Sequence, residues 1–455
     1  MTTPKERSDA LIQWVEEAGG CLHPSVEVYH DAVTKGSFRV KDGCTLNQGE
    51  SVVTLPITRS LSYLNAVCGH PDFPSIKHRI IESADSSPDK TWFPAGFLRE
   101  IPPHVIGRFV LMHEYQRGAA SPWWPYLRTL PQPEHVAGML PALWPADDLE
   151  FLTGTNAYVA VHEIKATLKK EYKQAMKLLP TDDFAPAAGF TRPLYLWAYA
   201  IFTSRSFRPS LIIPDADALA LPCEIDDFSV LLPLYDVGNH SPVARTAWRT
   251  DSETLLCRLI SGQACESGSQ VFNNYGMKTN AELLLGYGFI LPETEYLHND
   301  YVHVRTKATD DDDLAGTHLV SLRPLTDPTS VVGRSKRLMS DECAGDLVAQ
   351  FAHIQDSLVT SLYEAITRAA AAAAGEEDFQ DSATMDDIMT GHIAPPVKER
   401  IVQALGSKLA QDLDVLEEVE VPTGGLNANQ QLAVQYREQC IKTLENALRC
   451  LASDD

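Results

Sequence analysis

The spacing of apolar residues changes along this chain, and that change constrains the fold more than any other feature. Residues 38–40 and 51–55 are short strand-like segments separated by turn residues, and we expect them to form a small sheet. Over 103–118 and 147–178 apolar residues recur every three or four positions, which predicts helices. Strand-like and helical regions in separate stretches predict an α+β fold.

The last third of the chain has a mainly helical pattern. Apolar residues share one face of a predicted long helix over 347–366 and one face of a last helix over 432–448. A chain of 455 residues is also too long for a single core of ordinary size. We therefore expect a catalytic domain at 1–300, with a helical insert at about 60–200, and a mainly α-helical domain at 301–455.

The charge of the chain limits its partners. A formal net charge of −23 argues against nucleic acid or an anionic membrane as the main partner, because both attract basic surfaces. A basic protein is the more plausible partner.

Cysteine spacing and hydropathy indicate the compartment. The nine cysteines are scattered and never spaced as Cys-x-x-Cys, so no zinc cluster or disulfide framework is predicted. The N-terminus is polar, and no apolar run reaches the roughly 18 residues of a membrane span. We expect a protein of the cytoplasm or nucleus that binds no membrane.

Three stretches carry the candidate chemistry. They are 204–207 (SRSF), 233–241 (PLYDVGNHS), and 274–276 (NYG) leading to 286–289 (GYGF). The second stretch overlaps the apolar run 230–234, which is too short for a helix and suits a buried strand. Each stretch alone has a structural explanation: an arginine paired with an acid, an Asn-His turn, or a Tyr-Gly hairpin. Their order and content together point to function.

Together the stretches resemble the SET domain, in the branch with a large helical insert. That branch includes the Rubisco large-subunit methyltransferases, the SET-domain actin-histidine methyltransferase and the fungal ribosomal-protein and elongation-factor lysine methyltransferases. The resemblance covers most of residues 10–300, including 121–127 (SPWWPYL), which is similar to a passage of the insert. Beyond residue 300 only the helical pattern is similar. The resemblance implies a SET-domain β fold with a helical insert and a helical substrate-binding domain.

The resemblance also implies a cofactor and the residues that hold it. S-adenosylmethionine would donate a methyl group to a side-chain nitrogen of a protein, a displacement that depends mostly on positioning and requires no metal. Arg205 would contact the methionine carboxylate, the Asn239 side chain the amino-acid end, and the main chain at His240 the adenine. We interpret Asp236 as a structural residue that braces the Asn-His turn. We expect the enzyme to be a monomer.

Aromatic residues would form the substrate channel. By the resemblance, Tyr275 is the catalytic residue, next to the cofactor, and its hydroxyl orients the attacking nitrogen. Tyr287 and Phe289 would be the channel walls. An aromatic channel removes water from the amine and lowers its pKa, which favours the neutral nucleophile.

One loop departs from the family pattern. Family members carry a Gly-x-Gly cofactor loop near the start of the domain, whereas this chain has Lys-Gly-Ser-Phe at 35–38 and lacks the second glycine. Gly36 and Ser37 are the predicted cofactor contacts there. The sequence leaves three hypotheses: a protein-lysine N-methyltransferase for a non-histone protein, such as a ribosomal protein or translation factor; a protein-histidine N-methyltransferase; and a degenerate SET protein that binds a partner without turnover.

Overall fold

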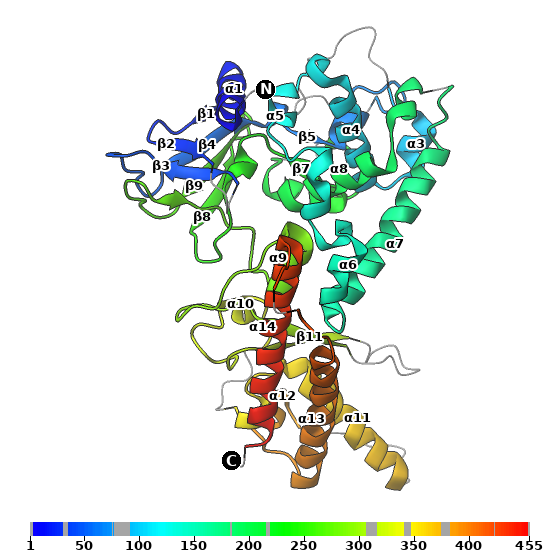
Figure 1. Ribbon diagram of the computed structural model, residues 1–455, viewed down its shortest axis with the longest axis vertical. Helices are drawn as coiled ribbons and strands as arrows, with labels where there is room; N and C mark the ends of the chain where they lie inside the picture. Colours follow the sequence, from blue (N-terminus) through cyan, green and yellow to red (C-terminus); the bar gives the residue numbers. More distant parts are fainter. Residues whose placement is uncertain are drawn as a thin grey trace. The chain divides into compact units, whose positions relative to one another are not determined.

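The computed structural model of the chain contains two compact units. The residues that the structure describes are 3–30, 35–74, 76, 92–182, 184–214, 219–305, 316–340, 347–374, 383–422 and 424–453. The first unit comprises Met1–Met139 and Lys165–Gly276, and the second comprises Leu140–Ile164 and Met277–Asp455. Both units therefore combine segments that are distant in sequence (Figure 1).

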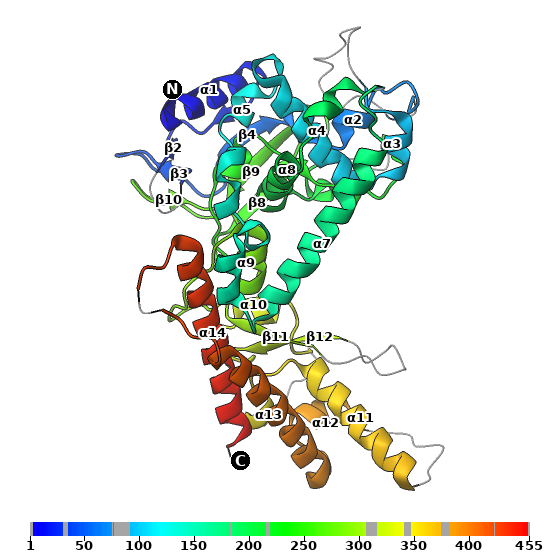
Figure 2. The ribbon, with the colours of Figure 1, turned by 45° about the vertical axis from the view of Figure 1, so that its right-hand side comes forward.

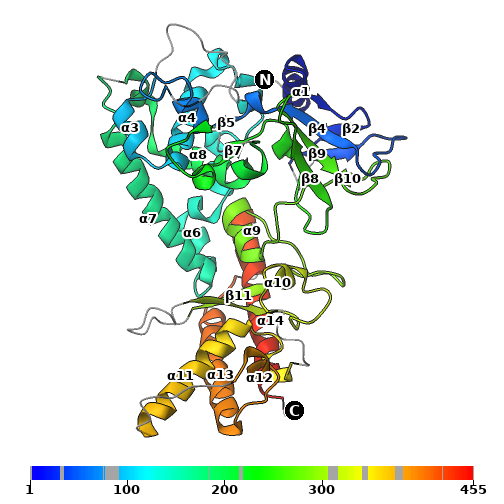
Figure 3. The ribbon, with the colours of Figure 1, turned by 180° about the vertical axis from the view of Figure 1, so that it is seen from behind.

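Three small antiparallel sheets form the β part of the first unit. Their strands are β1 (Cys21–Leu22), β2 (Val26–Tyr29), β3 (Ser37–Val40), β4 (Ser51–Pro56), β5 (Leu61–Ser62), β6 (Ser206–Phe207), β7 (Val230–Leu231), β8 (Thr246–Thr250), β9 (Leu256–Ser261) and β10 (Gln270–Val271). The strand orders are β1-β4-β9-β8, β10-β3-β2 and β5-β7-β6. Figure 3 shows β9 between β4 and β8.

Both predicted N-terminal strands form, but they do not share a sheet. β3 pairs with β2 and β10, whereas β4 pairs with β1 and β9, so the expectation of one small sheet is wrong. The partners β9 and β10 come from about 200 residues later, and local pattern does not encode such pairing. The predicted buried strand within 230–234 is confirmed as β7, whose two residues are buried.

Helices make up the rest of the first unit. They are α1 (Pro4–Glu17), α2 (Leu64–Val67), α3 (Ala95–Glu100), α4 (Pro103–Arg117), α5 (Trp124–Leu127), α8 (Arg192–Arg205) and residues 165–177 of α7 (Asn156–Lys177). The start of α1 follows from sequence: Thr3 and Glu6 form a capping box, and Pro4 occupies the first turn, where it has no N–H to leave unpaired.

A partly buried charge cluster joins three of these helices. Figure 2 shows α4 and α8 next to each other. Glu171 of α7 accepts hydrogen bonds from Arg108 of α4 at 2.7 Å and from the Tyr195 hydroxyl of α8 at 2.8 Å. His104 contacts the same carboxylate at 3.1 Å. These three helices thus share a specific polar anchor in addition to their apolar packing.

The second unit is mainly helical and includes a two-stranded antiparallel hairpin. Its elements are α6 (Ala146–Leu149), residues 156–164 of α7, α9 (Asn280–Tyr287), β11 (Tyr301–Arg305), β12 (Thr317–Ser321), α10 (Val331–Ser335), α11 (Asp356–Ala374), α12 (Met385–Met389), α13 (Pro395–Glu417) and α14 (Ala428–Leu451). In the part of the chain that the structure describes, no helix is both long enough and apolar enough to cross a membrane.

The helix predicted from residue 347 starts later, at Asp356. The N–H of Gln355 donates to the carbonyl of Leu319 at 3.0 Å, and Ile354 bridges to Val320. The backbone at 354–355 thus pairs with β12 and cannot extend the helix. The predicted last helix is confirmed as α14.

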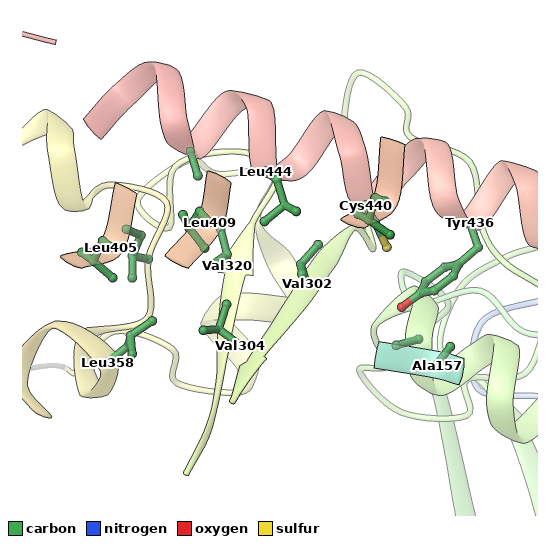
Figure 4. Close-up of a cluster of buried hydrophobic side chains, with 14 of the residues drawn as sticks. Ala157, Val302, Val304, Val320, Leu358, Leu405, Leu409, Tyr436, Cys440 and Leu444 are labelled. Carbon is green, nitrogen blue, oxygen red and sulfur yellow. The ribbon is translucent and has the colours of Figure 1, made fainter. Parts of the chain in front are cut away.

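The core of the second unit forms around α14. Figure 4 shows Tyr436, Cys440 and Leu444 of this helix on one side of the cluster, with Val302 and Val320 of the hairpin beside them. The Tyr436 hydroxyl donates to Asn156 Oδ1 at 3.1 Å. Residues 140–164 and 277–300, which the sequence analysis groups with the catalytic domain, therefore pack with the C-terminal segment. The division into a catalytic and a substrate-binding part remains a prediction.

Candidate functional site

Two segments of the first unit lie side by side and form the centre of the candidate site. The N–H of Asn273 donates to the carbonyl of Asn239 at 2.7 Å, and the N–H of Ser241 donates to the carbonyl of Asn273 at 2.9 Å. This parallel bridge brings the predicted Asn-His turn next to the predicted Tyr-Gly segment. Two of the three sequence motifs thus meet in one place.

Tyr275 is held against the turn by three contacts. Its N–H donates to His240 Nδ1 at 3.0 Å, its ring stacks on the imidazole with centroids 5.0 Å apart, and its hydroxyl donates to the Gly238 carbonyl at 2.8 Å. Since Nδ1 accepts, the neutral imidazole carries its proton on Nε2. Tyr275 and His240, which were predicted to belong to one site, are thus in direct contact.

Arg205 reaches the turn from the end of α8 through Asp236. Its Nη1 lies 3.2 Å from both the Asp236 carboxylate and the Asp236 carbonyl. The Asp236 side chain is 2% exposed and that of Arg205 is 29% exposed. Burial by itself would lower the pKa of Arg205, but the charge of Asp236, its hydrogen bond and the nearby Tyr126 and Tyr275 together outweigh burial, and the pKa lies above its usual value. Arg205 therefore remains a cation, and its other N–H groups can donate to an anion.

Tyr126 takes part in this cluster, and sequence reasoning assigned it no role. The buried Tyr126 of α5 donates its hydroxyl proton to Asp236 Oδ2 at 2.9 Å. Burial raises the pKa of Asp236, and the Arg205 charge and the Tyr126 hydrogen bond offset only part of that rise. Tyr126 lies in the 121–127 passage that supports the SET-domain resemblance, and this passage was the sequence feature that could have pointed to it. Asp236 thus braces the site through α5 and α8.

The backbone leading into the turn has an unusual conformation. Leu234 has φ +70° and ψ −35° although its side chain is fully buried. A non-glycine residue in this region costs about 1–3 kcal/mol and persists only where surrounding packing imposes it. The strained residue stands two positions before Asp236, so it sets the direction from which the carboxylate enters the cluster.

Two buried amide groups, one in the turn and one in the adjacent segment, lack partners among the described residues. The Nδ2 atoms of Asn239 and Asn273 are both buried, and neither has a hydrogen-bond partner in the part of the chain that the structure describes. Asn273 Oδ1, in contrast, accepts from Trp248 Nε1 at 3.2 Å. Buried donors are normally satisfied. A small molecule with polar acceptors at this position would satisfy the Asn239 amide.

Ser37 contacts the site, whereas Gly36 has no described contact with it. Ser37 is buried, and its hydroxyl accepts from the Asn239 N–H at 3.4 Å. At the position of the missing glycine, Phe38 is fully buried and packs on Gly238, where a Cβ would lie 3.2 Å from the ring. Lys35 has φ +67°, a left-handed conformation that glycine adopts more easily. Residues of β3 thus lie close to the Asn-His turn even though the loop lacks the second glycine of the family pattern.

Tyr287 and Phe289 belong to the second unit. Tyr287 is the last residue of α9, and its ring centroid lies 6.2 Å from that of Phe289. Burial raises the pKa of Tyr287 to about 12, so its hydroxyl remains neutral. Gly288 between them has φ +75° and ends the helix as a left-handed cap. Their assignment to a substrate channel remains a prediction.

The described residues contain no group of three His, Cys, Asp or Glu side chains arranged to hold a metal ion. The first unit instead offers a guanidinium held by a buried acid, a buried amide donor and a tyrosine hydroxyl fixed on a turn. Such a set can bind a small zwitterion and align a nucleophile beside it.

Comparisons with known proteins identify the fold. The chain aligns with the SET domain of LSMT bound to lysine and AdoHcy with a TM-score of 0.65 and 17% identity, over 98% of this chain and 90% of that one. The chain has the fold of the SET-domain methyltransferases. The resemblance and the α+β fold class predicted from sequence are confirmed. No protein-family model matches the chain.

Sequence relatives of the chain include protein methyltransferases. It is 35% identical over 215 residues to the ribosomal lysine N-methyltransferase set10 of Schizosaccharomyces pombe, a match that covers 45% of this chain and 36% of that protein. It is 27% identical over 229 residues to the actin-histidine N-methyltransferase of Drosophila melanogaster, which covers 47% of this chain and 40% of that protein. The chain thus matches less than half the length of either relative.

Proposed function

We propose that the protein is an S-adenosylmethionine-dependent protein-lysine N-methyltransferase that acts on a non-histone protein. The observation that carries this proposal is the buried Asn239 amide, which has no partner among the described residues and lies in the same turn that holds Tyr275. The similarity to set10 and to a SET domain bound to lysine and AdoHcy supports it.

The residues of the site fit the cofactor. The cofactor's carboxylate would accept from Arg205, which Asp236 keeps charged and aligned. The Asn239 amide would donate to the amino-acid end, and the main chain at His240 would meet the adenine. Ser37 contacts the backbone of Asn239 and would form the floor of this region, with Gly36 beside it. When bound, the cofactor supplies a methyl group on a positively charged sulfur.

Tyr275 would position the attacking nitrogen. Its hydroxyl donates to the Gly238 carbonyl, so the oxygen is turned to accept from the N–H of a substrate amine. A neutral amine that donates to this oxygen has its lone pair left for the methyl carbon. Tyr287 and Phe289 would line the approach and desolvate the amine, and the amine would lose its proton to solvent before transfer.

We propose a basic target, such as a ribosomal protein or translation factor. The printed name of set10 refers to a ribosomal substrate, and a net charge of −23 attracts basic proteins. We also propose that the enzyme works as a monomer in the cytoplasm or nucleus.

One experiment tests the reaction and its target together. The purified protein and S-adenosylmethionine with a labelled methyl group are incubated with an extract of cells that lack the protein. Mass spectrometry then locates the labelled residue. We expect label on a lysine of a basic protein, and far slower labelling with the Tyr275→Phe variant. Absence of label despite tight binding of S-adenosylhomocysteine would contradict the enzyme and favour the non-catalytic binding protein.

Transfer to histidine is the second candidate. The similarity to the actin-histidine N-methyltransferase of Drosophila melanogaster favours it. A tyrosine hydroxyl that accepts from a substrate N–H would serve an imidazole as well as an amine. The labelled residue in the same experiment distinguishes the two, because label on histidine would contradict the lysine assignment.

A further inference from the structure

The C-terminal half of α7 carries a basic stripe in a strongly acidic protein. Residues 165–177 contain five lysines and a single acid, although the whole chain has 61 acidic and 38 basic side chains. The lysines are Lys165, Lys169, Lys170, Lys173 and Lys177. All except the half-buried Lys165 are exposed. We call the four exposed lysines the lysine stripe; α7 is labelled in Figure 1.

The acid of this segment does not neutralise the stripe. Glu171 is turned inward and is bound by Arg108, His104 and Tyr195. Among the described residues, none of the four lysines of the stripe has an acidic partner within ion-pair distance.

Helix stability does not explain the stripe. Lys177 lies in the last turn, where the helix dipole favours a cation, but this effect fades within one turn and does not extend to Lys169. An ordinary solvated helix face alternates charges of both signs. Here Lys169, Lys173 and Lys177 are four residues apart, a spacing at which like charges repel by about 0.2–0.5 kcal/mol per pair. This repulsion between the lysines destabilises the free protein, whereas a bound anion would relieve it.

We propose that the lysine stripe is a docking surface for a short acidic segment of a partner protein. It spans about 12 Å along the helix axis, the reach of about four extended residues. Electrostatic attraction decays over about 10 Å at moderate salt, so a short acidic peptide on the stripe interacts mainly with the lysines.

Two observations favour a peptide over nucleic acid. A long polyanion would extend beyond the stripe onto a protein whose net charge is −23, and would be repelled there. The stripe also consists of ammonium groups alone, whereas phosphate recognition favours the bidentate fork of arginine. Carboxylates spaced along a peptide match these separate point charges.

The test measures binding of two probes to the full chain by fluorescence anisotropy. One probe is a labelled hexaglutamate peptide and the other is a uridine oligonucleotide of equal charge. Each is titrated against the wild type, the Lys169→Glu/Lys173→Glu variant and a control, Lys5→Glu/Lys41→Glu. The control changes two other exposed lysines and alters the net charge equally. Circular dichroism and the melting temperature verify that each variant is folded.

We expect the peptide to bind the wild type and the control, with affinity that falls as salt rises, and to lose at least tenfold in affinity in the stripe variant. Equal peptide affinity in the stripe variant and the control would overturn the proposal, as would no detectable binding to the wild type. Tighter binding of the oligonucleotide, lost with the same two lysines, would overturn it in favour of nucleic acid. None of these outcomes depends on methyl transfer.

Discussion

The backbone N–H of Tyr275 donates a 3.0 Å hydrogen bond to Nδ1 of His240, and the two rings stack 5.0 Å apart. The Tyr275 hydroxyl is fixed in turn on the carbonyl of Gly238. The tyrosine is thus anchored at its backbone, its ring and its oxygen to one turn of three residues. A hydroxyl held so rigidly can position a substrate nitrogen with little loss of entropy on binding.

Tyr275→Phe is expected to reduce turnover about 10²-fold or more, roughly 3 kcal/mol, with little change in cofactor affinity. Phenylalanine keeps the ring and its stacking on His240 and removes only the hydroxyl. The matched control is Tyr172→Phe, because the Tyr172 hydroxyl also donates to a backbone carbonyl at 2.8 Å, that of Phe190 in the helical insert. Initial rates and S-adenosylhomocysteine binding are measured on the same samples. Wild-type turnover in Tyr275→Phe would remove the catalytic assignment.

Asn239→Ala is expected to weaken S-adenosylhomocysteine binding by about 10- to 100-fold while the protein remains folded. The variant removes a buried donor that has no partner among the described residues, so the folded protein loses little and the complex loses a hydrogen bond. Isothermal calorimetry provides the measurement. Asn47→Ala is the control, since Asn47 is exposed and its side chain bonds to nearby Glu50. Equal affinities in the wild type and Asn239→Ala would place Asn239 outside the cofactor site.

The sequence predicted which residues of the site belong together, but not all of their partners. Asn239, His240 and Tyr275 stood in two motifs, and the bridge at Asn273 brings those motifs together. Tyr126 and Trp248 were missed because their bonds reach across 110 and 25 residues. In sequence alone, a tyrosine or tryptophan among apolar residues is predicted to be part of the core, and the hydrogen bond of its polar atom becomes visible only in the structure.

Long-range packing also limited what could be predicted about the fold. The spacing of apolar residues identified α4 and α14, because apolar residues recur every three or four positions in both helices. It gave no sign that Tyr436 of α14 would bond to Asn156, 280 residues earlier. Contacts of this kind group residues 140–164 with the C-terminal segment, and their specificity comes from packing and not from local periodicity.

Asp236→Asn is expected to lower the free energy of unfolding by up to about 3 kcal/mol and to weaken cofactor binding. The change removes the charge that holds Arg205 while keeping an oxygen for the Tyr126 hydroxyl. The control is Asp226→Asn, which disrupts a comparable pair with Arg208 at 3.9 Å whose side chains are 40% and 68% exposed. Exposed pairs contribute about 0–1 kcal/mol. Urea unfolding and calorimetry that gave the same result for both variants would show that the buried pair has no special role.

The stability of the helical insert should fall in acid as Glu171 becomes protonated. Burial opposes the charged form of Glu171, but the hydrogen bonds from His104 and Tyr195 and the charges of Arg108 and His104 together outweigh burial and lower its pKa from 4.5 to about 2. A carboxylate whose pKa is lower in the folded state stabilises the protein fully above its unfolded pKa. That stabilisation is lost between pH 4.5 and about pH 2 and amounts to about 3 kcal/mol.

Glutamine at position 171 does not titrate, so the difference in unfolding free energy between the wild type and Glu171→Gln should shrink across this window. Glu163→Gln, which changes an exposed acid on the same helix, should follow the wild-type pH curve. A wild-type advantage over Glu171→Gln that stayed constant from pH 5 to pH 2 would show that Glu171 does not stabilise the insert through its charge.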